Sequence, residues 1–234
     1  MVEEFLDPIG EPILWFLVSI IFGIISVYFI LKFRKMEKGT RSFISGIIFF
    51  STAFMVSRTI ENIRRYCGIG GYYDLFDITG LNLALRLAYY TILWAGIAML
   101  YFVFEKYVMN QKTKYILTIF SIITCAFSWA QYLAQGAAFV FPMYVACFFI
   151  VALFPIPLFA YCSKTSINKS QQIAWITMII GFIFLLLGVL GDSPEAFFIT
   201  LNLDQPFVHY FTPIAEAAGA IVMAYSLSTI YKYV

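Results

Sequence analysis

Residues 13–31 read ILWFLVSIIFGIISVYFIL, a run of nineteen residues without a charge, and the basic tetrapeptide KFRK follows directly at 32–35. An α-helix rises about 1.5 Å per residue, so a run of about 20 apolar residues matches the hydrocarbon thickness of a bilayer. The stretch therefore predicts a transmembrane helix that ends in basic residues at one membrane surface.

The whole chain has the composition of a membrane protein. Of its 234 residues, 62% are hydrophobic and 12% are charged, and the mean hydropathy is +0.87. Soluble domains average about 45–50% apolar and about 25% charged residues, so a soluble fold of this size could not bury so much apolar surface. Further apolar runs lie near residues 42–62, 83–104, 115–134, 139–161, 172–190 and 211–231. We predict an all-α integral membrane protein, a bundle of seven transmembrane helices that forms a single domain over residues 1–234.

The basic residues of the short connections predict the orientation, because cytoplasmic loops are enriched in Lys and Arg. Eleven of these residues fall on one side of the seven-span arrangement, whereas the other side carries acidic residues and no lysine. The eleven are Lys32, Arg34, Lys35, Lys38, Arg41, Lys106, Lys112, Lys114, Lys164, Lys169 and Lys232. This asymmetry predicts a multi-pass protein of the cell membrane with its N-terminus outside and its C-terminus in the cytoplasm. The longer connections of the outer side, 68–80 and 191–207, are either ordinary interfacial loops or a lid.

Four charged residues inside the spans are the first candidates for a functional site: Arg58, Glu61, Arg86 and Glu216. A charge within the bilayer is costly, so such residues usually face the bundle interior and pair with one another. Counting about 1.5 Å per residue from the cytoplasmic end of each helix places Arg58 and Glu216 at about 25 Å. The same count places Arg86 and Glu61 at about 29 Å. We therefore predict the ion pairs Arg58 with Glu216 and Arg86 with Glu61, or one four-membered network.

Two further arginines and two aromatic residues extend this cluster into a predicted binding site. Arg64 and Arg65 remain as an arginine excess after the pairing, and a guanidinium fork suits an anionic group on a ligand or lipid. Tyr90 and Trp94 follow Arg86 along one helical face and could wall a pocket beneath the charges. The candidate ligand-binding residues are Arg58, Glu61, Arg64, Arg65, Arg86, Tyr90, Trp94 and Glu216.

A purely structural interpretation of the same charges stays open at this stage. The charges lie near the outer interface, where arginines can extend to the lipid headgroups. Thr212 and Pro213 have the residue types of a helix N-cap and first position. Glu216 would then lie in the first turn of the last helix, where the helix dipole favours an acid without any partner.

Tryptophans and prolines add two local predictions. Trp15 and Trp129 at outer span ends and Trp175 at an inner one fit the aromatic girdle of a membrane protein. Pro155 and Pro157 lie near the cytoplasmic end of the fifth span, and proline removes a helical hydrogen bond. We therefore expect that span to be kinked.

Seven spans in this orientation resemble the microbial rhodopsins in topology. Arg86 on the third span and Glu216 on the seventh are similar in placement to an arginine and an acid of that family. The resemblance implies a retinal-linking lysine in the last helix, but Ala220 follows Glu216 by one turn and the only lysine of that span is the terminal Lys232. We therefore expect no bound retinal.

Two classes of function remain. An enzyme is not expected, because the chain has one histidine and lacks HExxH, GxSxG and CxxC motifs. For the same reason we expect no metal cofactor. Nucleic acid is not an expected partner. The first hypothesis is a ligand-binding or sensory, receptor-like module with an outward-facing polar pocket for a small anionic ligand or lipid. Because no connection can hold a soluble domain, it would signal through a protein partner or a homo-oligomer. The alternative is a transporter, a channel or a scaffold subunit of a larger membrane complex.

Overall fold

The computed structural model describes residues 10–34, 36, 38–67, 80–134, 139–191 and 205–233, and the regular secondary structure of these residues is entirely helical. The elements in chain order are α1 (Gly10–Phe33), α2 (Lys38–Tyr66), α3 (Gly80–Val103), the π-helix η2 (Phe104–Val108), α4 (Ile116–Leu133), α5 (Val140–Leu153), α6 (Pro155–Thr165), α7 (Lys169–Gly191), α8 (Gln205–Ile230) and the 3₁₀ turn η3 (Tyr231–Tyr233). The two outer connections, 68–80 and 191–207, for which the sequence leaves an ordinary loop or a lid open, lie almost wholly outside the described residues.

The predicted set of spans is confirmed. Within the described residues, seven helical stretches are long and apolar enough to cross a membrane, where α3 with η2 forms one stretch and α5 with α6 another. The stretches are Gly10–Phe33, Thr40–Tyr66, Gly80–Val108, Ile116–Leu133, Val140–Thr165, Lys169–Val189 and Tyr210–Ile230. The protein is therefore a multi-pass membrane protein built as a helical bundle.

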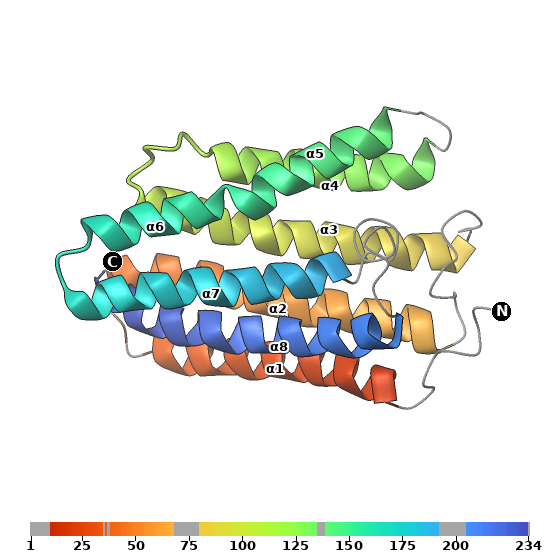
Figure 1. The fold of residues 1–234 in the computed structure, drawn as a ribbon, viewed down its shortest axis with the longest axis horizontal. Helices are drawn as coiled ribbons and strands as arrows, with labels where there is room; N and C mark the ends of the chain where they lie inside the picture. Colours follow the sequence, from red (N-terminus) through yellow and green to blue (C-terminus); the bar gives the residue numbers. More distant parts are fainter. Residues whose placement is uncertain are drawn as a thin grey trace.

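The helices lie lengthwise beside one another, and helices that follow in sequence also pack in space (Figure 1). α8 returns to pack against α1 as well as α7, which closes the arrangement. We call the end of the bundle where α1, α3 and α8 begin and α2 ends the N-end, and the opposite end the C-end (Figure 1). The connections after α1, η2 and α6, which carry most of the basic residues, lie at the C-end.

Glycines let α7 and α8 approach closely. A Cβ atom added to Gly188 would lie 2.7 Å from the backbone nitrogen of Glu216, and one added to Gly219 would collide with the backbone nitrogen of Leu185. Such contacts leave no room for a side chain, so glycine is required at both positions. The close packing holds the backbone of Glu216 directly against α7.

The predicted kink of the fifth span is confirmed at Phe154 and Pro155, where α5 ends and α6 begins. Pro155 has no N–H to donate to the carbonyl of Val151, four residues earlier. The hydroxyl of Tyr101 on α3 donates to that carbonyl instead, at 2.8 Å. The break lets α5 pack against α4 while α6 packs against α7 (Figure 1).

Two of the three tryptophans expected in an aromatic girdle are instead in the interior, so that prediction was wrong for them. Trp15 and Trp175 are each 1% exposed, whereas Trp129 is 39% exposed. Trp175 packs on the rings of Phe104 and Phe159. At a span end, the sequence alone does not distinguish a tryptophan that faces lipid from one that faces the neighbouring helix.

Candidate functional site

The first predicted ion pair, Arg58 with Glu216, is confirmed. The Nε of Arg58 on α2 donates to Oε1 of Glu216 on α8 at 2.7 Å, and its Nη2 donates to Oε2 of the same carboxylate. The third nitrogen, Nη1, donates to the hydroxyl of Tyr89 at 3.0 Å. Arg58 is 1% exposed and Glu216 is fully buried. The pair is therefore a two-pronged guanidinium–carboxylate contact in the bundle interior, the geometry that gives the strongest hydrogen bonds between side chains.

The second predicted pair, Arg86 with Glu61, is also confirmed, and two more arginines join it. Oε1 of Glu61 accepts from Nη1 of Arg86 and from Nε of Arg65, each at 2.7 Å. Arg64 donates to Oε2 at 2.9 Å and to Oε1 at 2.8 Å, and its Nη1 donates to Asn82 at 3.0 Å. We call Arg58, Glu61, Arg64, Arg65, Arg86 and Glu216 together the charge cluster.

The prediction that Arg64 and Arg65 are left over for a ligand was wrong. Both arginines are engaged by Glu61. The reason is that the sequence argument paired each carboxylate with one arginine, whereas two oxygens with several lone pairs can accept from three guanidinium groups. The interpretation that the arginines extend to headgroups also fails, since Arg58 and Arg64 are at most 1% exposed.

The alternative that Glu216 lies in the first turn of its helix was also wrong. α8 begins at Gln205, so Glu216 lies eleven residues further on and Pro213 is inside the helix. Eleven residues after the helix start, the Glu216 carboxylate is too far from the unpaired backbone N–H groups of the first turn to bind them. Glu216 is held by Arg58 instead.

Aromatic rings from α1 and α3 lie against the arginines of the cluster. The guanidinium of Arg58 lies 4.9 Å from the ring centroid of Trp15 and 5.6 Å from that of Tyr89. The guanidinium of Arg65 lies 5.8 Å from the same tryptophan ring. A ring face attracts a cation, so Trp15 closes the charge cluster off rather than facing lipid.

A small cavity of about 40 Å³ lies against the charge cluster. We call it the arginine cavity; its walls are Arg86, Tyr89, Tyr90, Leu93, Trp94, Ile97, Tyr144, Phe148 and Val189. Arg86 is 5% exposed, and its Nε is buried without a hydrogen-bond partner. Tyr90 and Trp94 thus line a cavity beside the charges, as the shared helical face indicates.

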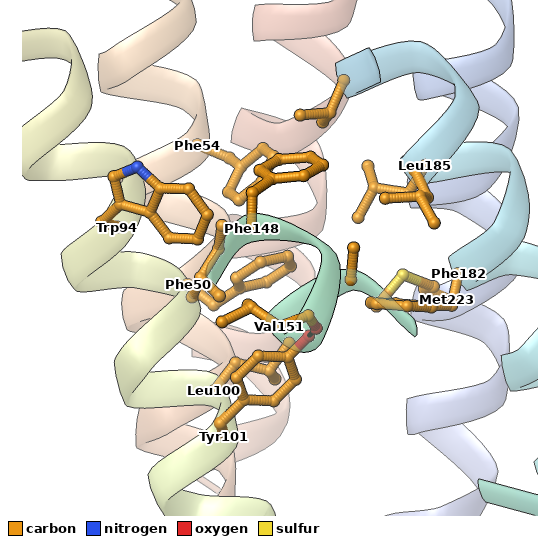
Figure 2. Close-up of a pocket in the computed structure, with 14 residues that line it drawn as sticks. Phe50, Phe54, Trp94, Leu100, Tyr101, Phe148, Val151, Phe182, Leu185 and Met223 are labelled. Carbon is orange, nitrogen blue, oxygen red and sulfur yellow. Dashed lines mark hydrogen bonds between the residues drawn. The ribbon is translucent and has the colours of Figure 1, made fainter. Parts of the chain in front are cut away.

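A second cavity of about 50 Å³ lies next to the first, between α2, α3, α5, α7 and α8, and its walls are almost wholly apolar. We call it the aromatic cavity. Figure 2 shows Trp94 on one side of it and Leu185, Phe182 and Met223 on the other. Trp94, Ile97, Phe148 and Val189 line both cavities, which makes them neighbours. The site therefore joins a buried guanidinium donor to an apolar recess.

The sequence missed the partners that are not charged. Asn82, Tyr89 and Trp15 each contact an arginine of the charge cluster. The distance of each arginine from the cytoplasmic end of its helix identifies charged partners at the same level of the bundle. Neutral residues of these types are too common in spans to be selected by this distance alone. Pro155 predicts a break in the fifth span but not a cavity beside it.

Compared with protein-family models, curated proteins and solved structures, the chain matches none. Its function is therefore inferred from the residues and geometry of the site.

Proposed function

We propose that this chain is a seven-helix ligand-binding or sensory module of the cell membrane, with its binding pocket near the N-end of the bundle. The observation that carries the proposal is the arginine cavity together with one of its walls, Arg86, a buried guanidinium whose Nε has no hydrogen-bond partner. A buried donor without a partner costs about 1–3 kcal/mol, and more for a charged group. A ligand that supplies the acceptor recovers this free energy.

The rest of the charge cluster supports binding by fixing Arg86 in place. Nη1 of Arg86 is tied to Glu61, which is itself held by Arg64 and Arg65. A group held in this way loses little conformational entropy when a ligand binds. The cluster thus acts as a preorganised frame for one donor.

The orientation and the partners belong to the same proposal. The basic residues at the C-end favour a cytoplasmic C-end, so the pocket lies toward the outside. Ligand binding between α3, α5 and α7 would shift the relative stability of helix arrangements. A protein partner or a second copy of the chain responds to that shift by binding one helix arrangement preferentially at the cytoplasmic end.

The test is a ligand screen with two tryptophan variants. Purified protein in nanodiscs is scanned for small molecules that raise its unfolding temperature in a saturable manner. Trp94 donates to Ser128 at 3.0 Å and Trp129 donates to Thr91 at 2.9 Å, so Trp94→Phe and Trp129→Phe each remove one indole hydrogen bond between α3 and α4. Only Trp94 lines the cavities. Binding weakened by Trp94→Phe alone supports the proposal, and a screen without any saturable stabiliser contradicts it.

A transporter is the second candidate, favoured by the break in the fifth span beside the cavities. Discontinuous helices line the substrate sites of many secondary transporters. Flux of a stabilising ligand into liposomes that contain the protein distinguishes the two. Binding without flux favours the sensory module, whereas flux favours the transporter.

A further inference from the structure

We infer that the ligand of the site is a short-chain monocarboxylate, an acid of about two to four carbons whose carboxylate meets Arg86 and whose hydrocarbon part enters the aromatic cavity. The inference rests on the proposed function and names the class of ligand. It follows from three features of the site: the free edge of the guanidinium, the size of the cavities and the sharp change in polarity between them.

The guanidinium of Arg86 offers a carboxylate-binding edge. Nη1 is taken by Glu61, and Nε, on the opposite edge, has no hydrogen-bond partner. Arg58 uses this same Nε edge to bind the carboxylate of Glu216. A carboxylate on the ligand would repeat at Arg86 the contact that the chain already makes at Arg58.

Tyr90 supplies a second polar contact at the same wall. Its hydroxyl lies 3.4 Å from the hydroxyl of Tyr132. A phenol hydroxyl can donate one hydrogen bond and accept another. The Tyr90 hydroxyl is therefore able to donate to a carboxylate oxygen while it accepts from Tyr132.

The volumes restrict the ligand to a few heavy atoms. The arginine cavity is about 40 Å³ and the aromatic cavity about 50 Å³. An apolar cavity of about 150 Å³ accommodates benzene, and a water molecule needs about 10–15 Å³. A carboxylate group fits the first cavity and a chain of one to three methylene or methyl groups fits the second.

The change in polarity excludes neighbouring classes of ligand. An inorganic anion satisfies Arg86 but leaves the aromatic cavity empty, and a neutral alcohol fills the aromatic cavity but lacks the charge. A long-chain fatty acid released from a lipid carries the same carboxylate but exceeds the space. Of these four classes, a short monocarboxylate is the one that uses both cavities.

The experiment measures dissociation constants on the purified wild-type chain in nanodiscs, in chloride-free buffer, by titration calorimetry. The probes are acetate, propionate and butyrate, the alcohols ethanol, 1-propanol and 1-butanol, nitrate as an inorganic anion, and dodecanoate for the lipid-derived source. The three short acids are expected to bind at least roughly tenfold more tightly than the alcohol of the same chain length, because a hydrogen bond to a charged group is lost in the alcohol.

Variants test separately where the carboxylate of the ligand binds and where its hydrocarbon part binds. Arg86→Met and Arg86→Lys both lose the Nε edge and are expected to weaken butyrate roughly tenfold or more, whereas Arg41→Lys, at an exposed residue of the C-end, leaves it unchanged. Ala152 is buried and lines the aromatic cavity, whereas Ala126 on α4 is exposed. Ala152→Val is expected to weaken butyrate and spare acetate, and Ala126→Val is expected to change neither.

The outcomes separate the inference from the proposed function. Equal affinity for alcohols or nitrate, tighter binding of dodecanoate, or full binding by the Arg86 variants overturns the short-chain monocarboxylate. If none of the acids binds but another compound stabilises the protein in a Trp94-dependent manner, the inference fails and the proposed function stands. If no compound of the screen stabilises the protein, both fail.

Discussion

Buried carboxylates at the two ends of the bundle are satisfied in different ways. At the C-end, Glu105 accepts from the backbone nitrogens of Leu117 and Thr118 at 3.0 and 3.1 Å and from the Thr118 hydroxyl at 2.6 Å. The two backbone donors are open N–H groups in the first turn of α4. At the N-end, Glu61 and Glu216 accept from arginines.

The kind of partner distinguishes a carboxylate that only stabilises the fold, Glu105, from the carboxylates of the candidate site, Glu61 and Glu216. Glu105 caps the start of α4 through backbone N–H groups and one hydroxyl. The arginines bring more donors than their carboxylates use, and Arg86, which lines a cavity, has an Nε without a hydrogen-bond partner. The C-end contact therefore holds the fold, whereas under the proposed function the N-end contacts also present Arg86 to a ligand.

The largest expected effect is at Glu216. Glu216→Gln leaves the buried guanidinium of Arg58 without a counter-charge, and breaking a buried pair in this way costs about 3–5 kcal/mol. The measurement is the free energy of unfolding in mixed micelles. A double-mutant cycle with Arg58→Met is expected to show coupling above about 0.5 kcal/mol. Additive effects would mean that the two residues are not partners.

Glu105→Ala is expected to have an intermediate effect, about 1–2 kcal/mol, because the loss of a helix cap falls in this range. The same unfolding assay measures it, with Thr118→Val as a milder variant that removes only the hydroxyl contact. A loss as large as that of Glu216→Gln would remove the distinction between the two ends.

Arg86→Met is expected to cost about 1 kcal/mol, since it removes one hydrogen bond while Glu61 keeps Arg64 and Arg65. Arg58→Met is the matched comparison, because it leaves Glu216 without its two-pronged partner and costs about 3–5 kcal/mol. Equal losses in the two variants would show that Arg86 is as structural as Arg58.

The smallest expected effect is that of added retinal. No lysine lies in the described interior of α8, where Ala220 is buried one turn after Glu216. Protein purified with retinal is therefore expected to show no red-shifted absorbance. A stable shifted band that hydroxylamine removes would contradict this expectation.

The sequence was sufficient for the spans and for two ion pairs among the charged residues inside them, because both follow from helix rise and the cost of charge in lipid. Arg58 with Glu216 and Arg86 with Glu61 were paired by height alone. The capping role of Glu105 was not predictable, because it depends on where α4 begins relative to η2. The burial of Trp15 depends on how α1 is rotated about its axis, which an almost uniformly apolar helix does not reveal.

The cavities could not be predicted from the sequence for a related reason. The shared face of Arg86, Tyr90 and Trp94 indicated a wall, but the empty volume depends on how α5 is placed relative to α7 by the break before Pro155. A proline predicts that a helix bends and leaves the direction of the bend open.

The most direct test of the central claim is a crystal structure with 3-bromopropionate, in which the bromine is located by anomalous scattering. We predict a bromine peak in the aromatic cavity near Trp94 and Phe148, with the carboxylate against the Nε of Arg86. A bromine peak only outside these cavities, for example in the lipid-facing groove between α1 and α8 lined by Tyr28 and Tyr225, would contradict the account.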